Sequence, residues 1–151
     1  MTATRASGPV VFAYDGSELA KLAIEEAGQL IGDTARQALA VTVWQPFDVG
    51  FIPPGGLKFD AQQVAEVRNA AELTAAAGAS AATAAGFRAE ALAIEGAPAW
   101  RAITGLADER DASLIVLGSH GRSGVASVLV GSVASSVVAH SHGSVLVVHR
   151  H

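Results

Sequence analysis

A glycine-rich segment near the carboxyl end of the chain has residue types that suit a phosphate group. It reads Gly118-Ser119-His120-Gly121, and Gly131-Ser132 follows after nine further residues. The apolar run 114–117 precedes it, so the glycines fall where the backbone leaves a buried strand and where it enters a helix. Glycine lets main-chain N–H groups approach a phosphate closely, and a helix N-terminus attracts anions. The segment therefore predicts a nucleotide phosphate as its ligand.

Two other stretches precede this segment in the chain and form a pattern with it. The run 10–18 is apolar and ends in Asp15-Gly16-Ser17-Glu18, and residues 94–98 read Ile-Glu-Gly-Ala-Pro. Together with the Gly-x2-Gly-x9-Gly-Ser spacing, they resemble the universal stress protein family, in its ATP-binding type, from about Pro9 to His149. The resemblance implies an α/β fold with an open, mainly parallel five-stranded sheet of order 3-2-1-4-5. Helices would cover both faces, as in Rossmann-like proteins.

Hydrophobic periodicity divides the chain into alternating strands and helices, which predicts a parallel sheet. Strands are expected at 9–14, 38–44, 87–95, 113–117 and 144–149, and helices at 17–31, 59–85, 98–110 and 132–140. The second helix is expected to break or bend near Gly78, because glycine is a poor helix former. We expect a flexible segment at 1–8 and one domain at 9–151. A mobile loop is expected at 45–58, since prolines and glycines are frequent there.

The binding crevice is expected beyond the carboxyl ends of the strands, where the strand order reverses. The resemblance places the first and fourth strands side by side, so Asp15 and Gly118 would flank this crevice. At its phosphate end we expect backbone contacts from Gly118, Gly121 and the start of the last helix, Gly131-Ser132-Val133. The alternative is a serine N-cap with ordinary turn glycines.

Two side chains of the glycine-rich segment carry or can acquire positive charge. Arg122 either pairs with a terminal phosphate through its guanidinium group or is a solvated loop arginine. The resemblance places His120 against the phosphate or ribose, and we expect contact without catalysis. The alternative for His120 is a loop histidine that contacts its neighbours.

The other end of the crevice would hold the adenosine part. The resemblance assigns adenosine contact to Asp15, which has a second interpretation as the cap of a capping box with Glu18. It assigns reading of the adenine edge to the backbone of Val43. Ala13, Tyr14 and Leu117 would line the pocket, although each is also a candidate core residue. Tyr14 is bulkier than the small aliphatic residue often found in the family.

Composition excludes several classes of function. The chain has 14 acidic and 10 basic residues with no basic run, so a nucleic-acid partner is not expected. Cysteine is absent, and no apolar run is long enough to span a membrane. We therefore expect a cytoplasmic protein without a membrane partner. Histidine pairs at 140/142 and 149/151 suggest metal binding, but no cysteine or acidic cluster completes a ligand set.

The sequence thus predicts an ATP-binding stress-response regulator or switch with at most slow ATP hydrolysis. The glycine pattern lacks the lysine of a P-loop, so no catalytic residue is assigned, and Mg²⁺ remains an optional companion of the phosphates. The alternative is a nucleotide-free or cyclic-nucleotide-binding interaction module of the same fold. The apolar run Val145–Val148 would form an edge strand, and the resemblance implies a homodimer through it. The sequence does not identify a further protein partner, and such a partner is compatible with it.

Overall fold

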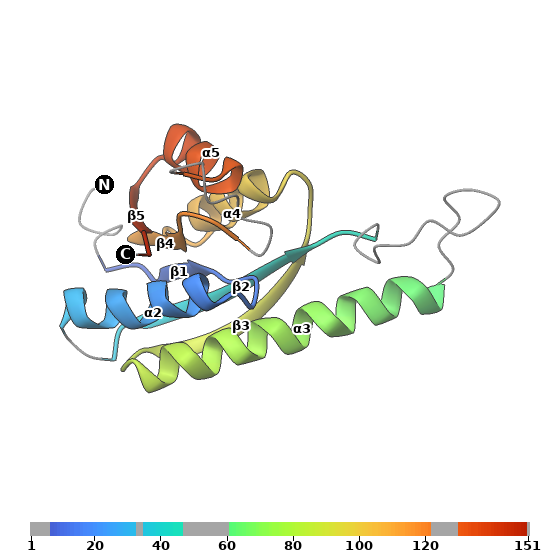
Figure 1. Cartoon of the computed structure of the whole chain (residues 1–151), viewed down its shortest axis with the longest axis horizontal. Helices are drawn as coiled ribbons and strands as arrows, with labels where there is room; N and C mark the ends of the chain where they lie inside the picture. The colour runs from blue at the N-terminus through green and yellow to red at the C-terminus, as the bar shows by residue number, and fades with distance from the viewer. Residues whose placement is uncertain (1–6, 33–34, 47–60, 122–129, 151) are drawn as a thin grey trace.

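The computed structural model describes residues 7–32, 35–46, 61–121 and 130–150 (Figure 1). Its five strands form one parallel sheet in the order β3-β2-β1-β4-β5, which confirms the predicted order. The strands are β1 (Val10–Ala13), β2 (Gln37–Trp44), β3 (Arg88–Glu95), β4 (Leu114–Gly118) and β5 (Ser144–Val148). The helices are α2 (Glu18–Ile31), α3 (Ala61–Ala84), α4 (Ala99–Glu109) and α5 (Ser132–His140).

Helices cover both faces of the sheet, with α2 and α3 on one side and α4 and α5 on the other (Figure 1). Consecutive residues of a strand point to opposite faces, so each strand contributes to two cores. Phe12 packs with Ile24 of α2 in one core, whereas Val11 packs with Val137 of α5 in the other. Because both faces are buried, the central strands consist of continuous apolar runs, as parallel strands do.

The start of α2 differs from the capping box considered for Asp15. Ser17 is the N-cap, and its side chain accepts a hydrogen bond from the N–H of Ala20 at 3.1 Å. Asp15 instead accepts from the N–H of Ser17 through Oδ1 at 3.0 Å. The capping-box assignment is therefore wrong, because serine stands at the position from which a side chain reaches the free N–H groups of the first turn. Asp15 lies two residues before this N-cap, in the connection between β1 and α2.

The helix α3 runs unbroken through Gly78, so the expected break is wrong. A Cβ atom added at Gly78 would lie 2.7 Å from the ring of Tyr14 and 3.2 Å from the Cβ of Ala40. The missing side chain therefore makes room for the Tyr14 ring, which is buried in the core on the α2–α3 side. Packing of the ring compensates for the low helix propensity of glycine here.

The N-cap of the last helix is a glycine and not the serine that follows it. Gly131 is the N-cap of α5, it makes no side-chain cap hydrogen bond, and Ser132 is the first helical residue. The alternative of a serine N-cap is therefore wrong. The first-turn N–H groups of α5 thus receive no bond from a capping side chain.

Two segments predicted to be flexible fall largely outside the described residues, namely 1–6 of the first and 47–58 of the second. At the described end of the first, the C=O of Gly8 accepts from Ser113 Oγ at 2.8 Å and from Arg36 at 3.3 Å. These bonds hold the entry to β1 beside the start of β4.

Candidate functional site

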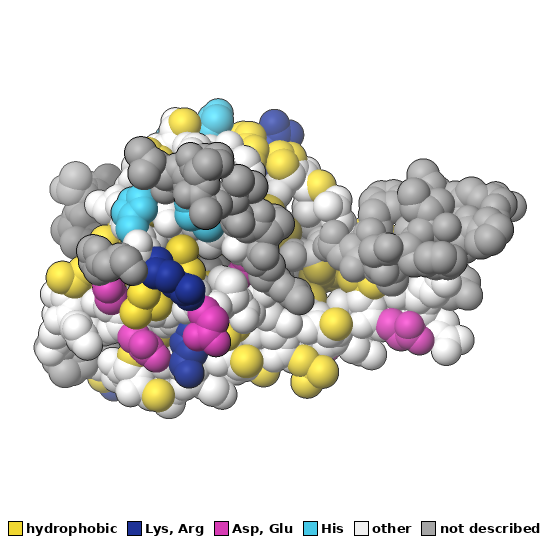
Figure 2. Space-filling model, in the orientation of Figure 1, with side chains coloured by type: hydrophobic (Ala, Val, Ile, Leu, Met, Phe, Trp, Pro, Cys, Tyr) yellow, Lys and Arg dark blue, Asp and Glu magenta, His cyan; other side chains and the backbone are white. Residues whose placement is uncertain are grey.

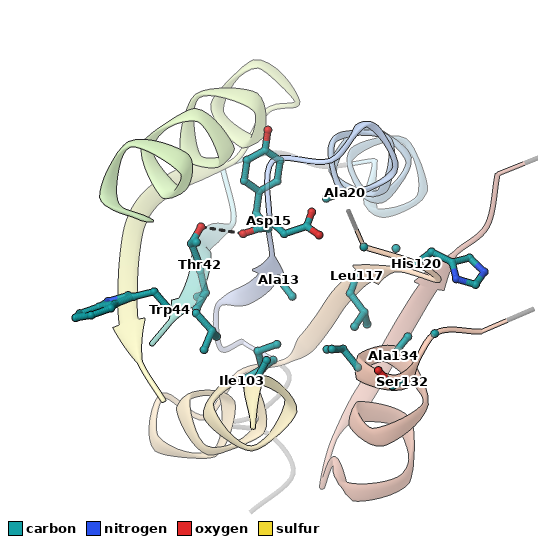
Figure 3. Close-up of a pocket in the computed structure, with 18 of the residues that line it drawn as sticks. Ala13, Asp15, Ala20, Thr42, Trp44, Ile103, Leu117, His120, Ser132 and Ala134 are labelled. Atoms are coloured by element: carbon teal, nitrogen blue, oxygen red, sulfur yellow. Dashed lines mark hydrogen bonds between the residues drawn. The ribbon is translucent and has the colours of Figure 1, made fainter. Parts of the chain in front are cut away.

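A pocket of about 840 Å³ lies at the carboxyl ends of β1, β2 and β4, where the strand order reverses (Figure 3). This volume is in the range of ligand-binding sites, and the location is where open parallel sheets bind ligands. The lining contains every predicted site residue that the structure describes: Ala13, Tyr14, Asp15, Val43, Leu117, Gly118, His120, Gly121, Gly131, Ser132 and Val133. Arg122 lies outside the described residues.

One end of the pocket is formed by the backbone of β2 beyond the end of β1. In a parallel ladder, alternate residues of a strand direct both N–H and C=O to the same neighbour. The C=O of Val41 accepts from Tyr14 N–H at 2.9 Å on the β1 side, and that of Trp44 accepts from Gly96 N–H at 3.0 Å on the β3 side. Val43 therefore directs its N–H and C=O toward the β1 side, where β1 has ended and the pocket begins.

Tyr14 contributes less of its side chain to the pocket than its size suggests. Its ring lies against Gly78 of α3, on the far side from α4 and α5, and only 9% of the residue is exposed. The tyrosine therefore does not narrow the pocket as a bulky residue pointing inward would. Its C=O is held by Thr42, whose Oγ1 donates a hydrogen bond at 2.8 Å (dashed line in Figure 3).

The other end of the pocket is formed by glycines that lie against other parts of the chain. A Cβ added at Gly118 would lie 2.8 Å from Cγ of Leu19, and one at Gly131 would lie 3.0 Å from the C=O of Ser119. The N–H of Gly131 donates to this same C=O at 2.6 Å. The glycines thus allow close packing of the β4–α5 connection as well as close approach of a ligand.

Asp15 lies nearer to the glycine-rich segment than the sequence suggested. A Cβ at Gly121 would lie 2.6 Å from Asp15 Oδ2, so the carboxylate is beside the expected phosphate end. The resemblance assigns Asp15 to the adenosine part, at the other end of the crevice. The other carboxylate oxygen, Oδ1, accepts the hydrogen bond from Ser17 N–H.

Charge in the pocket is low among the residues that the structure describes. Asp15 is the only described carboxylate in the lining, and the described lining contains no lysine or arginine. His120 adds an imidazole, whose Nδ1 lies near Gly131 and whose ring points away from the middle of the pocket in Figure 3. On the face shown in Figure 2, acidic and basic side chains of the described residues are interspersed, and the basic ones do not gather into a patch.

The carboxy-terminal histidines make separate contacts. His140 stacks on Trp100 with ring centroids 4.1 Å apart, and its Nδ1 lies 2.8 Å from the C=O of Ser136. His142 Nδ1 lies 2.8 Å from Oδ2 of Asp108. Within the described part of the chain, no group of three or more histidine, aspartate or glutamate side chains is placed to hold a metal ion.

Sequence reasoning missed several residues of the lining. Thr42 and Ile103 were not singled out, although Thr42 is a polar residue in an apolar strand and Ile103 lies on the apolar face of a helix. Gly96 belongs to a quoted motif but was given no role at the pocket. The remaining additions are Ala20, Val41, Trp44, Gln45, Ala99, Ser119 and Ala134. The register of β2 and the packing of α4 bring most of these residues to the pocket, whereas Ala20 and Ala134 come from the first turns of α2 and α5, and Ser119 belongs to the glycine-rich segment.

The fold and pocket define an open-sheet α/β protein with a ligand-sized cavity at its topological switch point. Residues 7–149 match the model of the universal stress protein family, and the chain belongs to that family. No curated protein matches the chain significantly. No helix in the described residues is long and apolar enough to cross a membrane.

Solved structures have the same fold as this chain. The hypothetical protein MJ0577 matches with a TM-score of 0.76 at 21% identity, over 97% of this chain and 98% of that chain. A universal stress protein in complex with cAMP is 29% identical with a TM-score of 0.59, over 95% of this chain and 98% of that chain. The universal stress protein from Archaeoglobus fulgidus in complex with dAMP is 25% identical with a TM-score of 0.59, over 93% and 96%.

Proposed function

We propose that this chain binds ATP in the pocket and acts as a nucleotide-dependent regulator of a stress response, with at most slow hydrolysis. The observation that carries the proposal is the pairing of two features in one cavity. One is the backbone edge of β2 at Val43, and the other is the N-terminus of α5, whose N-cap residue Gly131 makes no side-chain cap bond. The first suits a base and the second suits a phosphate.

The base end supports adenine in particular. Adenine presents an acceptor, N1, next to a donor, the 6-amino group, and the N–H and C=O of Val43 are complementary to this pair. Val41 and Leu117 supply apolar walls for the ring, and each is less than 5% exposed. Asp15 also lines the pocket, and its carboxylate can accept a hydrogen bond from a ribose hydroxyl.

The phosphate end supports an anion held mainly by backbone groups. Glycines at 118, 121 and 131 keep side chains out of this end, and the first turn of α5 directs N–H groups toward it. Mg²⁺ commonly binds one or two carboxylates together with phosphate oxygens and water. The Asp15 carboxylate beside Gly121 fits that description, so we propose Mg²⁺ as an accompanying ion.

Cyclic AMP is the second candidate ligand, and one observation favours it. The described lining contains no lysine or arginine, and it does contain a carboxylate, so it suits a singly charged phosphate better than a triphosphate. The relatives solved with cAMP and with dAMP show that the family accommodates adenine compounds with one phosphate. Comparing ATP, cAMP and AMP by calorimetry, with and without Mg²⁺, separates the two candidates.

The experiment that tests nucleotide binding is titration of Gly121→Val with ATP. The valine would collide with Asp15 and extend into the pocket, so we expect the affinity to fall by about 100-fold or more, equivalent to about 3 kcal/mol. Gly105→Ala is the matched control, because a Cβ there meets nothing within 4 Å and Gly105 does not line the pocket. Equal affinity of Gly121→Val and the parent would remove the glycine-rich segment from the proposal.

We also propose that the protein is a homodimer through β5. This strand lies at one edge of the sheet, and Val145, Leu146 and Val147 are only partly buried. An unpaired edge with apolar side chains favours pairing with a second copy. Backbone hydrogen bonds connect the pocket to this edge strand. The C=O of Ser119 accepts from Gly131 N–H, and the N–H of Ser119 donates to the C=O of Val148 at 2.8 Å.

The oligomeric state is measured by size exclusion with light scattering. We expect the mass of a dimer for the parent, and of a monomer for Val147→Lys, because a lysine there opposes edge pairing. A mass corresponding to the monomer at every concentration of the parent would contradict the proposed dimer.

A further inference from the structure

The pairing of β1 with β2 stops abruptly at the pocket. Tyr14 N–H donates to the C=O of Val41, and this is the last backbone bond between the two segments among the described residues. If the parallel ladder continued, the next bond would run from Val43 N–H to the C=O of Tyr14. No such bond occurs in the described part of the chain. Backbone pairing between the β1 segment and β2 therefore stops before Val43, the β2 residue that faces the pocket.

A side chain takes the place of that missing donor. Thr42 Oγ1 donates to the C=O of Tyr14 at 2.8 Å, and Thr42 is 8% exposed (Figure 3). Consecutive side chains of a strand project from opposite faces, so the Thr42 hydroxyl lies off the plane in which Val43 N–H points. The carbonyl of Tyr14 is thus satisfied from the α3 side of the sheet rather than by the neighbouring backbone.

We propose that Thr42 is a positioning residue for recognition of the adenine base, an inference that rests on the proposed function. By holding the carbonyl of Tyr14, it prevents the ladder from closing and keeps the N–H and C=O of Val43 available to a ligand. Adenine offers N1 as acceptor and its amino group as donor, whereas hypoxanthine offers a donor at N1 and an acceptor at O6. The preference for AMP over IMP therefore depends on Thr42.

Amide exchange in the ligand-free protein, followed residue by residue by NMR, tests the first half of this inference. We expect the Val43 amide to exchange at least about 100-fold faster than the Val41 amide, which lies within the ladder. In Thr42→Val the hydroxyl is lost at nearly constant shape, so the carbonyl of Tyr14 becomes available and Val43 exchange slows by about tenfold. Thr42→Ser keeps the hydroxyl and is expected to behave as the parent.

Two results from this experiment would overturn the proposal. One is a Val43 amide as slow as that of Val41 in the parent, which would mean that the ladder is already closed. The other is unchanged Val43 exchange in a folded Thr42→Val. If Thr42→Val does not fold, the parent and Thr42→Ser still decide, because a Val43 amide slowed in the serine variant would contradict a role for the hydroxyl.

Calorimetric titration with AMP and IMP tests the second half. We expect Thr42→Val to bind AMP about tenfold more weakly with little change for IMP, and Thr42→Ser to restore the parental ratio. A general structural effect would weaken both nucleotides alike and would contradict the inference. So would unchanged AMP affinity and an unchanged AMP/IMP ratio in Thr42→Val, but the proposed nucleotide function would then stand. Failure of the parent itself to bind AMP, ATP or cAMP would overturn both.

Discussion

The two ends of the pocket are built in different ways. At the base end, a backbone ladder is interrupted, and the N–H and C=O of Val43 face the cavity because β1 ends and Thr42 holds the carbonyl of Tyr14. At the phosphate end, side chains are missing, and Gly118, Gly121 and Gly131 lie so close to other parts of the chain that a Cβ would collide. One end is therefore sensitive to strand pairing and the other to side-chain size.

The largest expected effect on stability concerns the support behind the base end. In Gly78→Ala, the new methyl group would meet the Tyr14 ring, so we expect the free energy of unfolding to fall by about 1–2 kcal/mol despite the better helix propensity of alanine. Urea denaturation measures this change. Gly105→Ala, also within a helix but with open space around its Cβ, is expected to raise stability by up to about 1 kcal/mol.

A double mutant identifies the partner of Gly78. Combining Gly78→Ala with Tyr14→Ala should remove most of the penalty of the first change, because the ring that it meets is gone. If the two effects simply add, the contact between Gly78 and Tyr14 does not support the base end as described.

The next prediction separates the roles of Asp15 and Ser17, which lie in the connection between β1 and α2. Ser17→Ala removes the N-cap of α2 and is expected to reduce stability by about 1 kcal/mol without changing nucleotide affinity. Asp15→Asn keeps an oxygen for Ser17 N–H and is expected to change ATP affinity with a smaller effect on stability. Thermal unfolding and calorimetry on both variants measure the two quantities, and a loss of affinity in Ser17→Ala would contradict this division.

The smallest effect is expected far from both ends of the pocket. Asp108→Ala removes the contact with His142, whose side chain is 73% exposed, while that of Asp108 is 39% exposed. Exposed ion pairs contribute little, so stability should change by less than about 1 kcal/mol, with nucleotide affinity unchanged. Chemical denaturation and the same titrations check this. An affinity change would mean that the contact between α4 and the start of β5 influences the pocket.

Much of the fold could be predicted from the sequence because its signals are local. Apolar runs and helical spacing gave the order of the elements, and Gly131-Ser132 marked the start of α5 to within one residue. The strand order came from the resemblance to the family, because pairing of β1 with both β2 and β4 depends on contacts between distant residues.

The two ends of the candidate site differ in how well the sequence predicts them. Glycines are visible in a sequence, so the residues of the proposed phosphate end could be predicted from their spacing. The expected break at Gly78 was wrong because the ring that fills the space belongs to Tyr14, 64 residues earlier in the chain. Thr42 was missed because its role follows from the residue at which β1 stops pairing, which no local pattern reveals.

An NMR titration with ATP tests the central claim that one ligand spans both ends of the pocket. We expect the amide signals of Val43 at the base end and of Ser132 and Val133 at the phosphate end to shift together, with a single dissociation constant. Shifts at only one end, or no shifts in the pocket at saturating ATP, would contradict the account.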